Sequence, residues 1–296
     1  MHKDSKICIA GGDTMLETSL ARELRSRGYS NLCSLDSAEY VFLVGGKSGG
    51  IAANQKYPAD LMLDNLRLNA TVMQSAYELG ARKLLYLASS CCYPKECPQP
   101  MRPEYLMTGP LESTNEAYAT AKIAGIKLCQ AYRQQHGSDF ITAIPANIFG
   151  PGDDFSPENS HVISGLMRRM HEAKISRKSH IDLWGTGTAE REFIFIDDLA
   201  AGCVFLMQNY SDSTPINVGA SSQRFTIRHL AQLIKDVTGY QGELRFDASK
   251  PDGMPRKLLD SSVLEQMGWK PRSDFHTALS LTYEYFLESE REKTHA

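Results

Sequence analysis

The chain has 296 residues, of which 42% are hydrophobic and 23% are charged, and its formal net charge is −3. This length and composition suit one large globular α/β domain, or a domain with an added lobe, that buries a sizeable core. The small negative charge argues against nucleic acid or an anionic membrane as the main partner, and without a signal peptide or an apolar run of about 18 residues we expect a cytoplasmic protein.

The first predicted unit is a strand, a turn and a helix. Residues 6–10 form a short apolar run that ends in glycines, and residues 15–27 have helical periodicity. In a dinucleotide-binding fold, such a turn holds the cofactor pyrophosphate at the helix N-terminus. The usual G-x-x-G-x-x-G spacing is met only at Gly11, because Thr14 and Glu17 stand at the other two positions. Thr14 can offer its hydroxyl in exchange, whereas Glu17 brings bulk and a negative charge.

Two strand-like runs follow at residues 31–35 and 40–44, and only the four residues DSAE separate them. A parallel pair of strands normally needs a crossover of about a dozen residues. Either the two runs are not neighbouring parallel strands, or the crossover is trimmed to a loop and that edge of the sheet is reduced.

Helices and strands then alternate. The pattern predicts helices over residues 58–79 and 115–135 and strands over residues 83–88 and 140–144. This alternation favours an α/β fold with a Rossmann-type doubly wound parallel sheet. We assign residues 1–150 to a dinucleotide-binding Rossmann domain that is trimmed after its second strand.

Beyond residue 150 the pattern loosens, and we expect residues 151–296 to form mainly a smaller C-terminal α/β lobe for the substrate. Some of its segments should return to the main sheet. The sequence predicts helices at 165–173, 197–207, 226–238 and 277–289, and strands at 181–184, 192–196 and 243–246.

The helix over residues 115–135 carries Tyr118 and Lys122 one turn apart. Side chains at i and i+4 share a helix face, so the phenol and the ammonium can point into one site. A nearby ammonium favours phenolate and makes tyrosine a usable acid and base near neutral pH. Y-x-x-x-K alone is a weak signal, which gains weight from the glycine turn and the Ser/Cys-rich strand end that precede it.

The seven cysteines show no spacing typical of a metal site. Cys8, Cys33, Cys129 and Cys203 lie in apolar patterns and are expected to be small buried residues in a reducing compartment. We predict no metal centre.

Seven segments together resemble a known family: SSCCYPK, NEAYATAKIAGIKLC, IPANIFGPGDDF, NSHVI, LWGTGTAEREFIFIDDLA, INVG and DASKPDGMPRKLLD. They are similar to the extended short-chain dehydrogenase/reductases, also called the NAD-dependent epimerase/dehydratase family, and in particular to the GDP-L-fucose synthases. The resemblance runs from about residue 47 to the C-terminus. It implies a homodimeric enzyme that epimerises GDP-4-keto-6-deoxy-D-mannose at C3 and C5 and reduces C4 with NADPH.

For the epimerisation, the resemblance points to Cys91 and His161. A 4-keto group acidifies the protons at C3 and C5, so a base on one side of the ring and an acid on the other can invert each centre through an enolate. A thiol and an imidazole suit proton transfer near pH 7. The alternatives are a structural cysteine at a strand end and a histidine that bonds the backbone at a helix start. Cys92 is expected to pack in the core.

For the reduction, the resemblance implies that Tyr118 donates a proton to the 4-oxygen. It implies that Lys122 lowers the pKa of the tyrosine and contacts the nicotinamide ribose, and that Ser89 donates a hydrogen bond to the carbonyl. The nicotinamide supplies the hydride chemistry. The positions expected along the cofactor are Gly11, Thr14, Met15, Leu87, Ser90, Lys122, Asn147 and Ile148.

Four further residues match substrate-holding positions of the family: Arg169, Trp184, Arg191 and Asp252. Arginine suits a diphosphate because its fork of donors meets two oxygens at once. Trp184 is equally compatible with the core. Three basic residues near the last motif are compatible with a solvated loop, namely Lys250, Arg256 and Lys257.

The departures from the family all lie in the cofactor half. Besides Thr14 and Glu17, Asp13 replaces a basic residue of the family, and Asp13 and Asp36 both argue against an extra 2′-phosphate, so NAD(H) is possible beside NADP(H). We expect a complete epimerase-reductase with an unusual nucleotide pocket. The alternatives are an epimerase without the reductase step and a non-catalytic sugar-nucleotide-binding paralogue.

The helices over residues 58–79 and 118–135 carry apolar residues beyond one narrow stripe. One face of each would cover the sheet and another would stay exposed in a monomer. This pattern favours a homodimer in which two helices from each subunit form a bundle.

Overall fold

The computed structural model describes residues 1–12, 14–250 and 252–295. Its centre is a five-stranded parallel sheet in which the strands lie in the order β1-β2-β3-β4-β8. The strands are β1 (Ile7–Ala10), β2 (Tyr40–Leu43), β3 (Lys83–Leu87), β4 (Asp139–Pro145) and β8 (Ile216–Val218). All residues of β3 are buried, as expected for a parallel strand covered on both faces. The predicted α/β class is confirmed.

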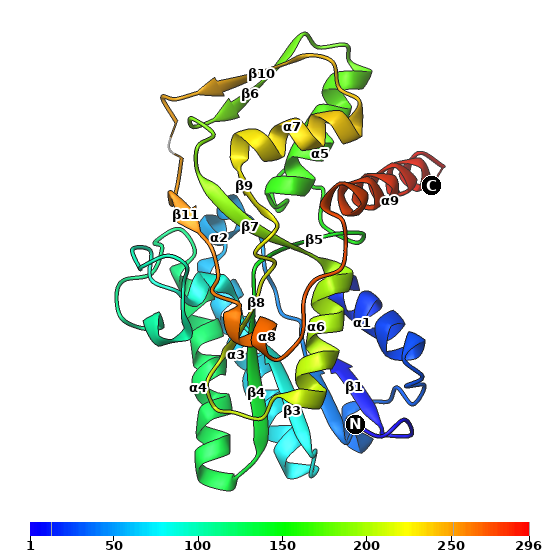
Figure 1. Ribbon diagram of the computed structural model, residues 1–296, viewed down its shortest axis with the longest axis vertical. Coiled ribbons are helices and arrows are strands. Elements are labelled where there is room, and N and C mark those ends of the chain that lie inside the picture. Colours follow the sequence, from blue (N-terminus) through cyan, green and yellow to red (C-terminus); the bar gives the residue numbers. More distant parts are fainter. Residues whose placement is uncertain (13, 251, 296) are drawn as a thin grey trace.

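Two pairs of helices cover the two faces of this sheet (Figure 1). Helix α1 (Thr14–Ser26) packs with α6 (Ile196–Asn209), and α3 (Pro58–Glu78) packs with α4 (Glu116–His136). Helix α3 begins at a proline, and α4 ends at Gly137, whose φ of 67° is left-handed. These helices confirm the elements expected from periodicity, and their placement on both faces confirms the doubly wound arrangement.

The outer edge of β1 is reduced. Leu32 forms one parallel bridge with Ile7, and residues 35–37 form a 3-10 helix from which the chain continues towards β2. The strand expected over residues 31–35 is therefore wrong, because the few residues before β2 cannot hold a crossover. Of the two alternatives, the structure shows the first: the two runs are not neighbouring parallel strands, because Leu32 and Tyr40 both pair with Ile7 and so lie on opposite sides of β1. The chain thus visits one side of β1 and then the other, which makes the carboxyl end of β1 a topological switch point, where ligands bind in such folds.

The smaller lobe lies beyond the carboxyl ends of the main strands (Figure 1). One of its sheets has the order β11-β7-β5 with β9 beside β7, and β10 pairs with β6. Its strands are β5 (Asn147–Phe149), β6 (His180–Trp184), β7 (Glu190–Phe195), β9 (Arg224–Thr226), β10 (Glu243–Asp247) and β11 (Arg256–Lys257). Its helices are α5 (Val162–Ile175), α7 (Ile227–Thr238) and α9 (Phe275–His295).

Several short elements were not predicted, because periodicity needs more residues than they contain. They are β5, β9, β11, the helices α2 (Ile51–Lys56) and α8 (Ser262–Gln266), and 3-10 helices at Ser90–Cys92 and Pro103–Tyr105. The α6 helix and the β8 strand come from the second half of the chain and complete the main sheet layer.

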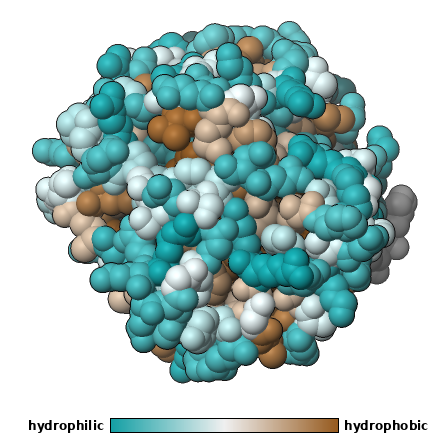
Figure 2. Space-filling view, turned by 60° about the horizontal axis from the view of Figure 1, so that its bottom comes forward, coloured by the Kyte–Doolittle hydropathy of each residue, from teal (hydrophilic) through white to brown (hydrophobic). Residues whose placement is uncertain are grey.

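The surface is largely hydrophilic on the face seen in Figure 2, where apolar residues form separate small groups. In the described ranges, no helix combines the length and the apolar character that crossing a bilayer requires. One contiguous core fills the space between the sheet and its helices, with Phe42, Tyr86 and Phe140 among its largest fully buried side chains.

Candidate active site

Helix α4 presents Tyr118 and Lys122 to the carboxyl ends of β2 and β3. Lys122 is buried, and its Nζ donates to the Gly45 carbonyl at 3.3 Å and to the Leu87 carbonyl at 3.2 Å. The same ammonium lies 5.9 Å from the centre of the Tyr118 ring. The i, i+4 spacing thus brings the two side chains to one place, with the lysine held by main-chain oxygens at the strand ends.

Gly125 allows this helix to lie close to the sheet. A Cβ at Gly125 would lie 2.4 Å from the ring of Tyr86 on β3, so any larger residue would push the helix away. The Tyr86 hydroxyl accepts from Asn69 at 3.1 Å and donates to the Lys122 carbonyl at 3.4 Å. Packing and hydrogen bonds therefore fix the distance between Lys122 on α4 and the strand β3.

Cys91 lies in the 3-10 helix that follows β3. Its N–H donates to Ser89 Oγ at 3.2 Å, while its Sγ accepts from Asn115 Nδ2 at 3.2 Å and from Lys257 Nζ at 3.3 Å. Burial raises the pKa of the Cys91 thiol, but the Lys257 ammonium, Ser89 and His161 together outweigh burial and lower this pKa below its ordinary value. The neighbouring Cys92 lies fully in the core, where burial raises its pKa to about 12.

His161 stands at the N-terminal end of α5, with Nδ1 3.7 Å from a buried carboxyl oxygen of Asp153. The nearby carboxylate of Asp153, with a contribution from Cys91, raises the pKa of His161, whose side chain is half-exposed. A thiol with a lowered pKa thus lies within electrostatic reach of an imidazole with a raised pKa. This combination favours a thiolate and an imidazolium, a base and an acid in one site.

The turn after β1 has the shape of a phosphate cradle. Gly11 has a φ of 128°, and a Cβ on it would lie 2.3 Å from the Cα of Gly45, so both strand ends need glycine there. The α1 helix begins directly after this turn, and Met15 lies beside Gly152, where an added Cβ would be 3.2 Å from the Met15 Cα. A helix that starts at the carboxyl end of a parallel strand directs the positive end of its dipole to this place, which suits a pyrophosphate.

Acidic groups gather beside this cradle. Burial, with smaller contributions from Cys33, Glu17 and Asp36, raises the pKa of Cys8 on β1 to about 11. Glu17 and Asp36 therefore both act on the same strand next to the cradle. Asp13 lies outside the described residues, as does the side chain of Thr14.

The other expected cofactor positions lie along the carboxyl ends of the strands. Leu87 ends β3 and its carbonyl accepts from Lys122, and Ser90, three residues later, is buried. Asn147 and Ile148 belong to β5, and Asn147 Nδ2 donates to the Glu192 carbonyl at 2.8 Å.

The expected substrate positions lie in the lobe. Arg169 donates to the Asp182 carbonyl, and Arg191 donates to the Met254 carbonyl at 2.7 Å. Asp252 accepts from the Thr186 N–H at 2.7 Å and from its hydroxyl at 2.8 Å. Trp184 is 71% exposed, so its interpretation as a core residue is wrong.

Three residues of the site were not identified as functional from the sequence. Asn115 precedes α4, Asp153 supports His161, and Lys257 contacts Cys91 from β11, so Lys257 does not belong to a solvated loop. The signal available for Asn115 was its place before a helix start, whereas Lys257 lies 166 residues from Cys91 and no local pattern links them. Within residues 1–12, 14–250 and 252–295, no group of three or more His, Cys, Asp or Glu side chains could hold a metal ion.

Comparisons with known proteins identify the family of this chain. Residues 24–219 match the model of the NAD dependent epimerase/dehydratase family. The chain is 47% identical to GDP-L-fucose synthase 1 of Arabidopsis thaliana, covering 97% of this chain and 94% of the relative. It is 42% identical to the GDP-L-fucose synthase of Escherichia coli K12, covering 96% and 97%. The first alignment spans 306 positions against 296 residues here, so the plant relative has residues without a counterpart in this chain.

Two solved structures are also similar over nearly the whole chain. A GDP-6-OMe-4-keto-L-xylo-heptose reductase from C. jejuni has a TM-score of 0.89 and 29% identity, covering 98% of this chain and 99% of that one. MlghC, a GDP-mannoheptose C4 reductase from Campylobacter jejuni with NADP bound, has a TM-score of 0.85 and 31% identity, covering 97% and 99%. The chain therefore belongs to the NAD dependent epimerase/dehydratase family, in the branch that contains the GDP-L-fucose synthases.

Proposed function

We propose that the protein converts GDP-4-keto-6-deoxy-D-mannose to GDP-L-fucose by inverting C3 and C5 and reducing C4. The observation that carries this proposal is the pairing of a thiol of lowered pKa with an imidazole of raised pKa, next to the Tyr118 and Lys122 pair. The relatives of 42% and 47% identity support the same activity over nearly the whole chain. They give no support to an epimerase without reduction or to a non-catalytic paralogue.

In the epimerisation, the Cys91 thiolate removes the proton from the carbon next to the 4-keto group, which leaves an enolate. His161 in its protonated form returns a proton to the opposite face of that carbon. Lys257 and Asn115 hold the charge of the thiolate, and Asp153 holds the charge of the imidazolium. The same pair serves C3 and C5, which both flank the carbonyl, and between the two inversions the Cys91 thiol gives its proton to solvent and His161 takes one from solvent.

In the reduction, the bound dinucleotide supplies a hydride to C4. Tyr118 gives its phenolic proton to the 4-oxygen, and Ser89 donates a hydrogen bond to the same oxygen. Lys122 lies close enough to Tyr118 to favour the phenolate that results, and its carbonyl partners at the strand ends keep it there.

The cofactor we propose is NADP(H), held by the turn at Gly11, Thr14 and Met15 and by the strand ends at Leu87, Ser90, Asn147 and Ile148. The glycine cradle fits a pyrophosphate. A similar structure of 31% identity is described with NADP bound, which supports this choice. The acids beside β1 leave NAD(H) as a second candidate, which binding measurements can separate.

We assign the nucleotide diphosphate of the substrate to the lobe. We define the lobe as residues 151–296, except for the segments that belong to the main sheet layer. Arg169 and Arg191 supply guanidinium donors for the diphosphate. Trp184 is exposed and can stack on a base, and Lys250 lies 5.9 Å from its ring centre. Asp252, fixed by Thr186, can accept hydrogen bonds from the nucleoside.

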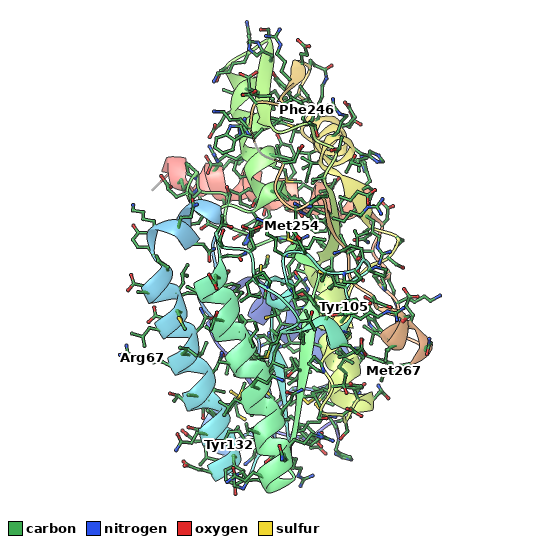
Figure 3. The ribbon with its side chains drawn as sticks, turned by 90° about the vertical axis from the view of Figure 1, so that its left-hand side faces the viewer. Arg67, Tyr105, Tyr132, Phe246, Met254 and Met267 are labelled. Atoms are coloured by element: carbon green, nitrogen blue, oxygen red, sulfur yellow. The ribbon has the colours of Figure 1, made fainter. Side chains whose placement is uncertain are left out.

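A homodimer is the proposed assembly. Helices α3 and α4 lie side by side as the layer nearest the viewer in Figure 3. Three large apolar side chains remain exposed along and just after α3, namely Leu63, Tyr77 and Leu79. A second copy that packs on this layer would form a bundle of four helices and cover them.

The cytoplasm is the proposed location. All seven cysteines are free thiols, which suits a reducing compartment.

The test of the activity is to incubate the protein with GDP-4-keto-6-deoxy-D-mannose and NADPH and to identify the product by NMR. We expect GDP-L-fucose, with one NADPH oxidised for each sugar. A product that is reduced at C4 but keeps the configuration at C3 and C5 would reject the epimerase half of the proposal.

A further inference from the structure

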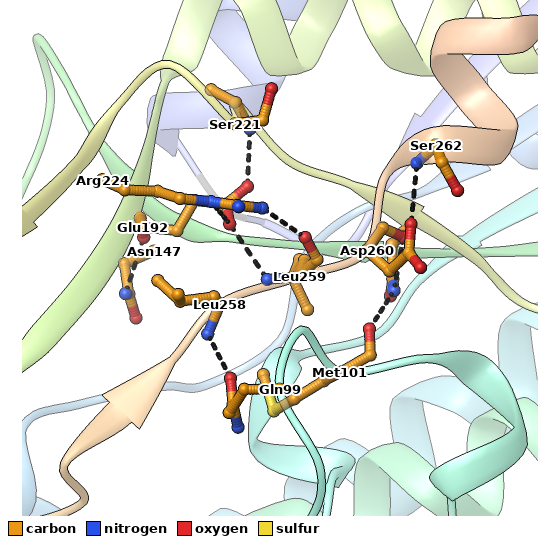
Figure 4. Close-up of polar contacts among 12 residues, drawn as sticks. Gln99, Met101, Asn147, Glu192, Ser221, Arg224, Leu258, Leu259, Asp260 and Ser262 are labelled. Carbon is orange, nitrogen blue, oxygen red and sulfur yellow. Dashed lines mark hydrogen bonds and ion pairs between the residues drawn. The ribbon is translucent and has the colours of Figure 1, made fainter.

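A buried carboxylate lies where the lobe meets the main sheet. Glu192 on β7 has no exposed surface, and its two oxygens accept from the Ala220 N–H at 2.8 Å, the Leu259 N–H at 2.9 Å and Arg224 Nε at 2.9 Å (Figure 4). Arg224 in turn donates to the Leu259 carbonyl at 2.7 Å. Glu192 and Arg224 thus form hydrogen bonds with both main-chain groups of one residue, the N–H and the carbonyl of Leu259.

The segment around Leu259 is held from its other side as well. The Leu258 N–H donates to Gln99 Oε1 at 3.0 Å, and the Leu258 carbonyl accepts from the Met101 N–H at 2.8 Å. The Asp260 N–H donates back to the Met101 carbonyl at 2.9 Å (Figure 4). Residues 258–260 therefore lie between the Glu192 and Arg224 pair and the loop after Cys91. Hydrogen bonds on both sides restrict the movement of this segment.

Lys257 is the residue directly before this clamped segment. It pairs with Arg191 in the register of β11 with β7, and its Nζ donates to Cys91 Sγ at 3.3 Å. The main chain of Lys257 is thus held by its pairing with β7 and, two residues later, by the hydrogen bonds of Glu192 and Arg224 to Leu259. A shift of this short strand would move the ammonium away from the sulfur.

We propose that the buried Glu192 and Arg224 pair is a positioning device that sets the Lys257 ammonium against the Cys91 thiol. The role of this contact in epimerisation rests on the function proposed above, whereas the effect on the thiol itself does not. Glu192 also accepts from Asn147 through its carbonyl, so the same residue touches a strand expected along the cofactor.

The close fit around the carboxylate supports a dedicated site. A Cβ at Gly219 would lie 2.1 Å from Glu192 Oε1, so a side chain there would displace the carboxylate. The charged groups that act on Cys91 are Lys257 from β11 and His161, the residue before α5, and the neutral donors are Ser89 and Asn115. Of the two charged groups, only Lys257 is held by Leu259, so a change at Glu192 should reach Cys91 through Lys257.

The test measures alkylation of Cys91 by iodoacetamide against pH, followed by peptide mass spectrometry so that other cysteines do not interfere. In Glu192→Gln we expect the inflection of the alkylation rate against pH to rise by about one pH unit, because the Lys257 ammonium no longer stabilises the thiolate. Lys257→Met, which removes the ammonium itself, should raise the inflection as well. An unchanged inflection in Glu192→Gln, beside a raised one in Lys257→Met, overturns the proposal.

The matched control is Asp198→Asn. Asp198 is also a buried carboxylate that accepts main-chain N–H groups, those of Arg272 and Ser273, but it lies on α6 away from Cys91. We expect no shift of the inflection in this variant. A rise equal to that of Glu192→Gln would mean that any loosening of the fold moves the thiol, and would also overturn the proposal.

Gln99→Ala provides a milder change if Glu192→Gln does not fold. It removes one anchor of Leu258 from a partly buried loop, and we expect a smaller rise of the inflection in the same direction. A lowered or unchanged inflection contradicts the proposal. Because alkylation needs no sugar nucleotide, a raised inflection in a protein that fails to make GDP-L-fucose would reject the proposed function and leave the positioning pair standing.

Discussion

At the residue scale, the site holds two proton carriers whose pKa values are displaced in opposite directions. Lys257 lies 3.3 Å from the sulfur of Cys91, and the pKa of this thiol is lowered despite its burial. Asp153 supports His161, whose pKa is raised. Both displacements enlarge the pH range in which the thiolate and the imidazolium exist together, which is the state that can take a proton on one face and give one on the other.

Asp153→Asn tests the acid half of this pair. A raised pKa keeps His161 protonated to higher pH, so loss of the Asp153 charge should lower the pH at which His161 loses its proton. We expect the alkaline limb of epimerisation to move down by roughly half a unit to one unit, with the acid limb, set by Cys91, little changed. The pH profile of solvent exchange at C3 and C5 measures this shift.

The neighbouring acid provides the control for that change. Asp154 is exposed, and its carboxylate accepts from the Ser156 N–H at 2.7 Å. Asp154→Asn should leave the alkaline limb in place. An equal shift in both variants would mean that long-range charge, and not the contact at 3.7 Å, sets the pKa of His161.

At the element scale, the cradle after β1 lies before residue 24, where the match to the family model begins. Glu17 lies in the first turn of α1, at the end of the helix to which we assign the pyrophosphate. Glu17→Gln should tighten dinucleotide binding about fivefold, because removal of a repulsion of about 1 kcal/mol has that effect on Kd. Calorimetric titration with NADPH and with NADH measures it, and added salt should reduce the difference.

The control lies further along the same helix. Glu23→Gln makes the same charge change near the other end of α1, where Glu23 pairs with Arg27, and should leave both affinities within error. Weaker binding in Glu17→Gln would mean that Glu17 helps to shape the turn. A preference of the unaltered protein for NADPH over NADH at low micromolar concentration would show that the acids beside β1 do not select against the 2′-phosphate.

The layer of α3 and α4 carries the prediction on assembly. Leu63 on α3 is 46% exposed in the single chain, and a second copy packed on this layer would cover it. Leu63→Glu would bury a charge at that interface, so we expect a dimer in the unaltered protein and mostly monomer in the variant at micromolar concentration. Sedimentation velocity separates the two states. A monomer in the unaltered protein, or a dimer that tolerates the glutamate, would speak against this interface.

How much the sequence predicts depends on the range of the contacts involved. Tyr118 and Lys122 were identifiable because a helix repeats every turn, and the long helices and strands have periodicities that a single sequence reveals. The short run at residues 31–35 has the composition of a strand, yet too few residues follow it for a crossover. Lys257 and Asp153 support Cys91 and His161 through tertiary contacts, which local patterns do not encode.

At the scale of the whole molecule, the site is assembled from two layers. Cys91, Tyr118 and Lys122 come from the elements of the main sheet, whereas His161 and Lys257 come from the lobe beyond the carboxyl ends of its strands. The reduced edge of the sheet beside β1 contains none of these five residues. The epimerisation should therefore be separable from the reduction, since it needs no external hydride.

The most direct test is solvent exchange without a reductant. The protein is incubated with GDP-4-keto-6-deoxy-D-mannose in deuterated water, and deuterium at C3 and C5 is followed by NMR. We predict incorporation at both carbons in the unaltered protein and in Tyr118→Phe, which should lose only the reduction. In Cys91→Ser the incorporation should fall by about 100-fold or more. Incorporation at the unaltered rate in Cys91→Ser would contradict the central claim that this thiol is the base of the epimerisation.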